Sequence, residues 1–153
     1  QMNIRPYLCG PRMIERARTR SDYDALVVAE LTAFLAARTA VYDLIVSADT
    51  LVYFGRLEPV LTAAAAALRP GGRLAFTVER LEEAATADGF RLDPSGRYRH
   101  AEAYVRRVLT GVGMEVETLE SVTLRLEGGQ PVVGFLASAR KTPAGDEVAT
   151  AQE

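Results

Sequence analysis

The hydrophobic pattern is most regular in one central stretch, where two strand-like runs flank a helix-like run. Residues 42–49 begin polar, turn apolar and end in small and acidic residues, which is typical of a buried parallel strand that leads into a site. From residue 50 to 68 apolar residues recur at helical spacing among many alanines, and Pro70-Gly71-Gly72 ends the run. Residues 73–78 return as a strand. The pattern predicts a parallel strand-helix-strand unit, which would bind a ligand beyond the carboxyl ends of its strands.

The beginning of the chain predicts a weak strand followed by a helix. Residues 3–9 contain Arg5 and Pro6, so they are expected to form an edge strand at most. Residues 12–20 have the spacing of a helix, which Gly10-Pro11 opens with proline in the first turn. The inner face of this helix is expected to consist of Met13, Ile14 and Ala17.

A second strand and a short helix are predicted immediately before the central unit. Residues 23–31 repeat the apolar run of a buried strand and place Glu30 near its carboxyl end. A short helix over residues 32–37 is expected to use Thr32 as its cap.

The segment after the central unit is expected to cross the carboxyl edge of the sheet and enter another helix. Residues 79–96 are rich in Glu, Ala, Asp and Gly, and we expect a flexible excursion with a helical turn at residues 81–87. Residues 95–105 then lead into a helix that continues through Leu109 and ends at Gly111 or Gly113.

The last part of the chain predicts an antiparallel hairpin and a polar tail. Residues 114–125 alternate, Gly128-Gly129 provides a turn, and residues 130–141 pair back. Residues 142–153 lack periodicity and are expected to be a disordered tail. Together the patterns predict an α/β fold, Rossmann-like and doubly wound, with a mostly parallel sheet and a C-terminal antiparallel hairpin.

Composition narrows the function classes. With 153 residues the chain is expected to form one domain, and 48% apolar residues with a net charge of −2 argue against a disordered chain or a polyanion-binding protein. Cys9 is the sole cysteine, so no internal disulfide is possible. We find no signal peptide and no run long enough to span a membrane, and we expect a cytoplasmic protein with no membrane or nucleic-acid partner.

Three motifs together resemble class I S-adenosylmethionine-dependent methyltransferases. The stretch YDLIVSADTLVYFGRLEPVLTAAAAALRPGGRLAFTVE is similar to the region from the fourth to the fifth strand of that family, and GPRMIERA resembles the helix after its second strand. The segment SGRYRHAEAYVRRVLTGVG resembles a subgroup of predicted methyltransferases that are often found with tetratricopeptide repeats. The resemblance covers most of residues 1–141, which we take as a methyltransferase-like domain.

The resemblance implies S-adenosylmethionine as the cofactor and a small molecule or a protein group as the methyl acceptor. Glu30 corresponds to the acid that lies near the adenine in the family, where it is usually an Asp, one methylene shorter. Since a sulfonium methyl is already electrophilic, transfer depends chiefly on aligning donor and acceptor. The expected cofactor-binding residues are Cys9, Gly10, Met13, Glu30, Leu31, Ser47, Ala48 and Asp49.

The sequence departs from the family at its beginning. The family's Gly-rich turn, whose backbone approaches the methionine part of the cofactor, has no counterpart, and neither does the acid that holds the ribose. We therefore expect the domain to be one N-terminal strand-helix unit short, with exposed apolar strand edges that favour a homodimer. The alternative function is a methyltransferase-like domain without cofactor binding, which acts as an interaction module or is a truncated fragment.

Two residues are candidates for catalysis, each with a structural alternative. His100 has the right pKa range for a general base in the acceptor pocket, but a histidine at a helix start also caps or packs locally. Asp49 is placed to orient an acceptor amine or hydroxyl or to hold the cofactor's amino group, and it also suits a turn.

Other candidates are open between a site and a structural role. Tyr53 and Tyr98 suit either an acceptor pocket or the core, and Cys9 is either a reactive thiol or a small apolar residue. Clustered arginines suggest either attraction of an anionic acceptor or a solvated helix face; they are Arg97, Arg99, Arg106 and Arg107. We find no motif for a metal site.

Overall fold

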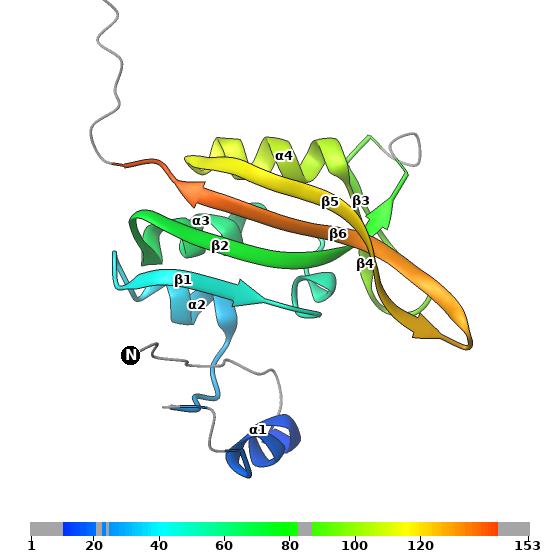
Figure 1. The fold of residues 1–153 in the computed structure, drawn as a ribbon, viewed down its shortest axis with the longest axis horizontal. Coiled ribbons are helices and arrows are strands. Elements are labelled where there is room, and N and C mark those ends of the chain that lie inside the picture. Colours follow the sequence, from blue (N-terminus) through cyan, green and yellow to red (C-terminus); the bar gives the residue numbers. More distant parts are fainter. Residues whose placement is uncertain (1–10, 21–22, 24, 83–86, 144–153) are drawn as a thin grey trace, which may run out of the picture.

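The structure is a computed structural model that describes residues 11–20, 23, 25–82 and 87–143. Four α-helices, a 3₁₀ turn and six strands are formed within this part of the chain (Figure 1). In chain order they are α1 (Pro11–Arg18), α2 (Leu31–Ala36), β1 (Tyr42–Ser47), η1 (Leu51–Tyr53), α3 (Glu58–Ala67), β2 (Leu68–Leu81), β3 (Phe90–Leu92), β4 (Tyr98–Ala101), α4 (Glu102–Gly111), β5 (Met114–Glu127) and β6 (Gln130–Lys141).

The strands form one mixed sheet in the order β3-β4-β2-β6-β5, with β1 pairing along the first part of β2. β1 and β4 run parallel to β2, whereas β6 is antiparallel to β2, β4 to β3 and β5 to β6. The predicted α/β fold and its C-terminal antiparallel hairpin are confirmed. The parallel pairs are β1 with β2 and β4 with β2, and both lie on the same side of β2.

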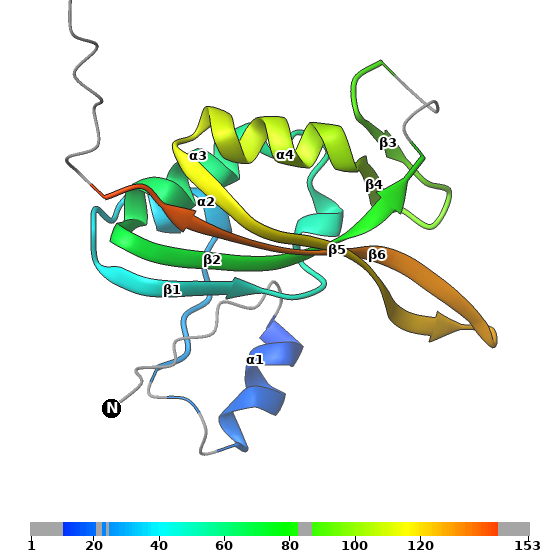
Figure 2. The ribbon, with the colours of Figure 1, turned by 45° about the horizontal axis from the view of Figure 1, so that its top comes forward.

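Helices α2, α3 and α4 cover the same face of the sheet, and α1 lies apart from them, beyond the β1 edge (Figures 1 and 2). The core lies between the sheet and these three helices, since alternate residues of β2 are buried, among them Leu74, Phe76 and Val78. Burial of α3 is achieved with small residues, because Ala63, Ala64 and Ala67 allow the helix to approach closely.

The helix predicted for residues 50–68 is shorter than expected, and this prediction was wrong in its first half. Residues 51–53 form the turn η1, and α3 begins only at Glu58 with a proline in its first turn. Gly55 explains the interruption, since an added Cβ there would lie 2.7 Å from a ring carbon of Tyr98. The segment between η1 and α3 therefore lies against the β3-β4 hairpin.

The Pro-Gly-Gly segment does not end the helix but lies inside β2. The helix ends at Ala67, and Leu68 already has extended backbone angles. The register between β1 and β2 shifts here, because Tyr42 faces Leu68 whereas Leu44 faces Arg73. Gly71 adopts a φ of 78°, which an L side chain rarely adopts, and so permits this bulge.

The strand predicted for residues 23–31 is not formed in the described part of the segment. Val27 makes an isolated bridge, and the neighbouring described residues have no ladder. An extended run becomes a strand only where a second strand supplies hydrogen bonds along its length. The apolar residues of this segment were expected to be buried, which holds only in part, since Val28 is 61% exposed.

The expectation of a flexible excursion over residues 79–96 was also wrong in part. Residues 79–81 continue β2, and β3 forms an antiparallel hairpin with β4. The predicted helical turn at 81–87 includes residues outside the described part, and its first residue, Leu81, is the end of a strand. The segment 95–105 contains β4, from Tyr98, before α4 begins, and α4 ends at Gly111, one of the two predicted ends.

The terminal hairpin agrees with the sequence pattern. β5 and β6 pair over almost their whole length, and Gly128 and Gly129 both adopt positive φ in the turn. The strand expected at residues 3–9 lies outside the described residues, as do residues 144–153 of the expected tail.

Candidate site at the carboxyl edge of β1

The carboxyl end of β1 delivers Ser47, Ala48 and Asp49 to one edge of the sheet, as predicted. Asp49 has a φ of 51°, so the chain turns sharply here. Its backbone N–H donates to Oγ1 of Thr77 on β2 at 3.1 Å, which ties the turn to the neighbouring strand. The Asp49 side chain is 61% exposed and is therefore available to a ligand.

Glu30 is the N-cap of α2, so the expectation that Thr32 caps this helix was wrong. The carboxylate of Glu30 accepts hydrogen bonds from the backbone N–H groups of Thr32 at 2.9 Å and Ala33 at 2.6 Å. These bonds favour the charged form and lower the pKa of Glu30. Leu31 is the first residue of the helix and is half-buried. The cap keeps the Glu30 carboxylate close to the helix start.

A cluster of charged side chains lies along the same edge, centred on Glu79 of β2. Glu79 is buried, with 2% of its side chain exposed, and its closest cationic partner is Arg125 of β5. Arg97 and Arg99 lie farther away, each at 3.9 Å from a Glu79 oxygen. A buried carboxylate needs such partners, since an unpaired buried charge is costly.

The arginines that the sequence grouped as a basic patch are engaged with carboxylates or rings. Arg97 pairs with Glu127 and Arg99 with Asp93 at 2.8 Å, while Arg106 pairs with Glu102 one helical turn away. Arg107 lies over the ring of Tyr104 at 5.3 Å. Neither earlier interpretation describes all four, because Arg97 and Arg99 belong to the cluster around Glu79 and precede the helix.

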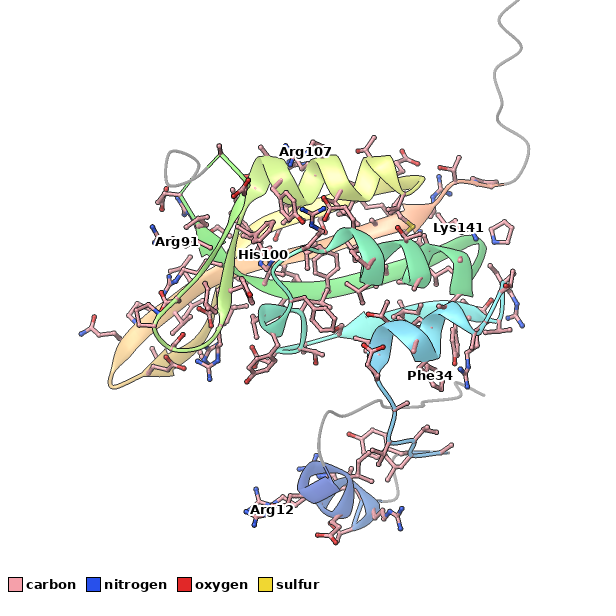
Figure 3. The ribbon with its side chains drawn as sticks, turned by 180° about the vertical axis from the view of Figure 1, so that it is seen from behind. Arg12, Phe34, Arg91, His100, Arg107 and Lys141 are labelled. Carbon is pink, nitrogen blue, oxygen red and sulfur yellow. The ribbon has the colours of Figure 1, made fainter. Side chains whose placement is uncertain are left out.

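His100 is located in β4 and is fully buried, with 0% exposed (Figure 3). It lies two residues before α4 and does not cap the helix, but it packs locally against Tyr104 of α4, as the structural alternative expected. Its Nε2 lies 2.9 Å from the Gly55 carbonyl oxygen, and because a carbonyl only accepts, Nε2 carries the proton. Among the described residues Nδ1 has no hydrogen-bond partner. The ring is stacked on Tyr104 with centroids 6.0 Å apart.

Tyr104 connects α4 to the start of α3. Its hydroxyl donates to Oε2 of Glu58 at 2.6 Å and accepts from the backbone N–H of Leu57 at 2.9 Å. Burial, together with the bond to Glu58, raises the pKa of Tyr104 to about 12. His100 and Tyr104 therefore fix the segment that follows the candidate site. The sequence did not indicate this role of Tyr104, because a tyrosine at this helical spacing also suits an ordinary core position.

The two tyrosines that were candidates for an acceptor pocket differ in environment. Tyr53 of η1 is 59% exposed, on the segment that follows Asp49, which fits the acceptor-side interpretation better than the core interpretation. Tyr98 packs edge-on against Phe90 with ring centroids 6.2 Å apart and is half-buried. Tyr98 therefore belongs to the packing of the β3-β4 hairpin.

The pH dependence of stability is expected to report on His100, the sole histidine of the chain. Burial lowers its pKa below the ordinary 6.5, against a smaller opposing effect of the Gly55 and Phe54 carbonyls. Below pH 6.5 the unfolded chain binds a proton that the folded chain does not. The free energy of unfolding therefore decreases as the pH is lowered, by up to about 1.4 kcal/mol per pH unit, until the folded-state pKa is reached.

Urea denaturation at intervals between pH 8 and pH 5 measures this effect. The variant His100→Gln cannot titrate and should lose the slope just below pH 6.5 while keeping any change at lower pH that comes from carboxylates. An unchanged slope in the variant would refute the assignment.

The remaining predicted site residues are not described. Cys9 and Gly10 lie outside the described residues, and of Met13 only its backbone within α1 is described. Within the described ranges there is no group of His, Cys, Asp and Glu side chains that is arranged to hold a metal ion. The helices found there are all too short or too polar to cross a bilayer.

Comparison with known proteins adds a family match over the first half of the chain. The family model described as "Methyltransferase domain" matches residues 9–76, which include α2, β1 with the turn at Asp49, and the first part of β2. No curated protein sequence matches the chain.

Solved structures of methyltransferases share the fold. The S-adenosylmethionine-dependent methyltransferases from Methanosarcina mazei and Mesorhizobium loti superpose with TM-scores of 0.71 and 0.69 at 15% and 21% identity. The first comparison covers 92% of this chain and 82% of the other, the second 91% and 80%.

A third structure contains a cofactor product. It is the 1,6-didemethyltoxoflavin-N1-methyltransferase from Burkholderia thailandensis with bound 1,6-didemethyltoxoflavin and S-adenosylhomocysteine, with a TM-score of 0.63 at 16% identity over 90% of this chain and 60% of the other. These structures show that the fold of the chain is shared with methyltransferases, one of which is recorded with S-adenosylhomocysteine bound.

Proposed function

We propose that this chain transfers a methyl group from S-adenosylmethionine to an amine or hydroxyl of a small molecule or protein. The observation that carries the proposal is the carboxyl edge of β1, where an exposed carboxylate follows a sharp turn inside the region that matches the methyltransferase family. Ligands of parallel α/β units bind at this edge.

In this proposal the cofactor lies along the ends of β1 and the start of α2. Ser47, Ala48 and Asp49 are at its methionine end, where the Asp49 carboxylate accepts from the amino group, and Glu30 and Leu31 are near the adenine. Cys9, Gly10 and Met13 complete the proposed set. The bound cofactor supplies an electrophilic methyl group, so the protein's task is alignment.

The charge distribution favours an acceptor that donates a hydrogen bond over an anionic acceptor. Arg97, Arg99 and Arg125 are all paired with carboxylates of the chain, whereas Asp49 makes one long ion pair and is the more exposed partner. The charge that remains available at this edge is therefore negative. His100 is not placed to act as a base, because its ring is fully buried and its protonated nitrogen is bonded to Gly55. If the acceptor must lose a proton, Asp49 is the better placed group.

Binding of S-adenosylhomocysteine tests the proposal without knowledge of the acceptor. A concentration 100 times the dissociation constant is expected to raise the free energy of unfolding by about 2.7 kcal/mol in a thermal scan. Asp49→Asn should weaken binding about tenfold, because a charge-assisted hydrogen bond is lost.

The matched control is Asp43→Asn on β1, the strand that precedes Asp49. Asp43 is 80% exposed and pairs with Arg69 on the surface, so its replacement should leave binding unchanged. A folded chain that shows neither heat nor a thermal shift with S-adenosylhomocysteine would refute the methyltransferase proposal.

An apolar strip on β1 favours a second role in self-association. Leu44 and Val46 are 51% and 66% exposed, and in the described part of the chain β1 is paired only with β2. An open strand with exposed apolar side chains is suited to pairing with another strand, here that of a second copy. This role would also serve an interaction module that lacks cofactor binding.

Sedimentation over a range of concentrations tests self-association. We expect a dimer that Val46→Lys converts to a monomer, whereas Leu126→Lys, at a position that is 68% exposed near the hairpin turn, leaves it intact. A wild-type chain that stays monomeric at high concentration would exclude this role. Association with tetratricopeptide repeats and a cytoplasmic location remain predictions from the sequence.

A further inference from the structure

The hairpin of β5 and β6 contributes a side chain to the edge of the sheet where the candidate site lies. Figure 1 shows the turn of this hairpin extending away from the helices, beyond β1. The register between β5 and β6 shifts between Val116 and Thr118 and again between Thr123 and Arg125, so Leu124 forms the second bulge. A bulge bends the strand and redirects the next side chain.

Gly134 of β6 holds this bulge in place. A Cβ at this position would lie 2.3 Å from the Val78 carbonyl oxygen and 2.4 Å from Cδ1 of Leu124. Leu124 therefore occupies the space that a side chain on residue 134 would need. The consequence is that the bulge is fixed against β2, and Arg125 next to it faces Glu79.

Arg125 joins three carboxylates from three parts of the chain. One terminal nitrogen donates to buried Glu79 of β2, the other lies 3.4 Å from Oδ1 of Asp49, and Nε donates to Glu127 at 2.9 Å. Only 21% of the Arg125 side chain is exposed, against 61% for Asp49. The buried pair of Glu79 and Arg125 is therefore fixed, and Arg125 restrains the more exposed Asp49.

We propose that Arg125 is a positioning residue, which Glu79 anchors and which holds the Asp49 carboxylate in the orientation that binds the cofactor. The inference rests on the proposed function, because it needs Asp49 to contact the ligand. It makes the C-terminal hairpin, which lies outside the segment that matches the methyltransferase family, a part of the cofactor site. A planar guanidinium can hold a ligand-binding carboxylate in a fixed orientation in a way that the single ammonium of lysine cannot.

A double-mutant cycle on S-adenosylhomocysteine affinity tests the inference. Arg125→Met is expected to raise the dissociation constant about fivefold in the wild-type background and to have no effect when Asp49→Asn is present, since the two residues act through one contact. Arg125→Met/Glu79→Gln leaves no unpaired buried charge and should show the same loss, which separates positioning from stability. Arg140→Met, in a surface pair with Glu115, should bind as the wild type does.

The outcomes separate the two proposals. Wild-type binding with a loss from Arg125→Met that persists in full in the Asp49→Asn background would overturn the positioning role and leave the proposed function intact. Wild-type binding that none of the Arg125 variants changes would overturn it as well. Failure of the folded wild-type chain to bind would overturn the proposed function and this inference together.

Discussion

Gly134→Ala is expected to lower the free energy of unfolding by about 3 kcal/mol, the upper part of the range for overpacking a close-packed interior. The added methyl would meet the Val78 carbonyl oxygen at 2.3 Å and the Leu124 side chain at 2.4 Å. The leucine can rotate, but the carbonyl belongs to the central strand β2, so β6 must move away from it. Urea denaturation measures the change as a lower midpoint.

Gly111→Ala is the matched control for this substitution. Gly111 is the last residue of α4, and a Cβ there would have no heavy atom within 4 Å. Alanine at a helical position is expected to be neutral or to stabilise by up to about 1 kcal/mol. Equal effects of the two substitutions would contradict the close contact between β6 and β2.

Arg125→Met is expected to destabilise the fold by about 3 kcal/mol, the lower end of the range for breaking a buried ion pair. The loss arises because Glu79, 2% exposed, loses its closest cationic partner, while Arg97 and Arg99 remain 3.9 Å away. Thermal and urea denaturation of the variant measure this loss.

The control is Arg140→Met on the adjacent strand. The side chains of Arg140 and Glu115 are 39% and 65% exposed, and an exposed pair contributes less than about 1 kcal/mol. If both substitutions cost the same, Glu79 does not depend on Arg125. If Arg125→Met/Glu79→Gln is as unstable as the single variant, the cost does not come from an unpaired charge.

The sequence predicted best those features that follow from a repeating local pattern. The β1-α3-β2 unit and the terminal hairpin have strong periodicity and turn residues, and Asp49 was predicted at the end of β1 from the change to small and acidic residues alone. The first half of the predicted helix was wrong, because Gly55 lies against Tyr98, a residue that is distant in sequence.

The error in the predicted strand has the same cause, whereas the error in the helix cap is local. The segment 23–31 reads as a strand, but pairing depends on a neighbour that composition does not specify. Glu30 rather than Thr32 caps α2, although either side chain is able to accept from a helix start.

The sequence predicted only the part of the candidate site that is formed by consecutive residues at the end of β1. Glu79 and Arg125 are separated by 46 positions, and no spacing indicates their contact. Gly134 did carry a signal, because glycine inside a strand often marks a close backbone approach. The signal gives no partner, so Leu124, Val78 and the resulting direction of Arg125 required the structure.

The most direct test of the account is to map where S-adenosylhomocysteine binds, by following backbone amide resonances of the labelled chain during titration. The account predicts saturable shifts at Ser47, Ala48, Asp49 and Leu31, a smaller shift at Arg125, and none at Gly128 and Gly129 in the hairpin turn. Shifts confined to another surface, or no shifts in a folded sample, would contradict the placement of a cofactor at the carboxyl edge of β1.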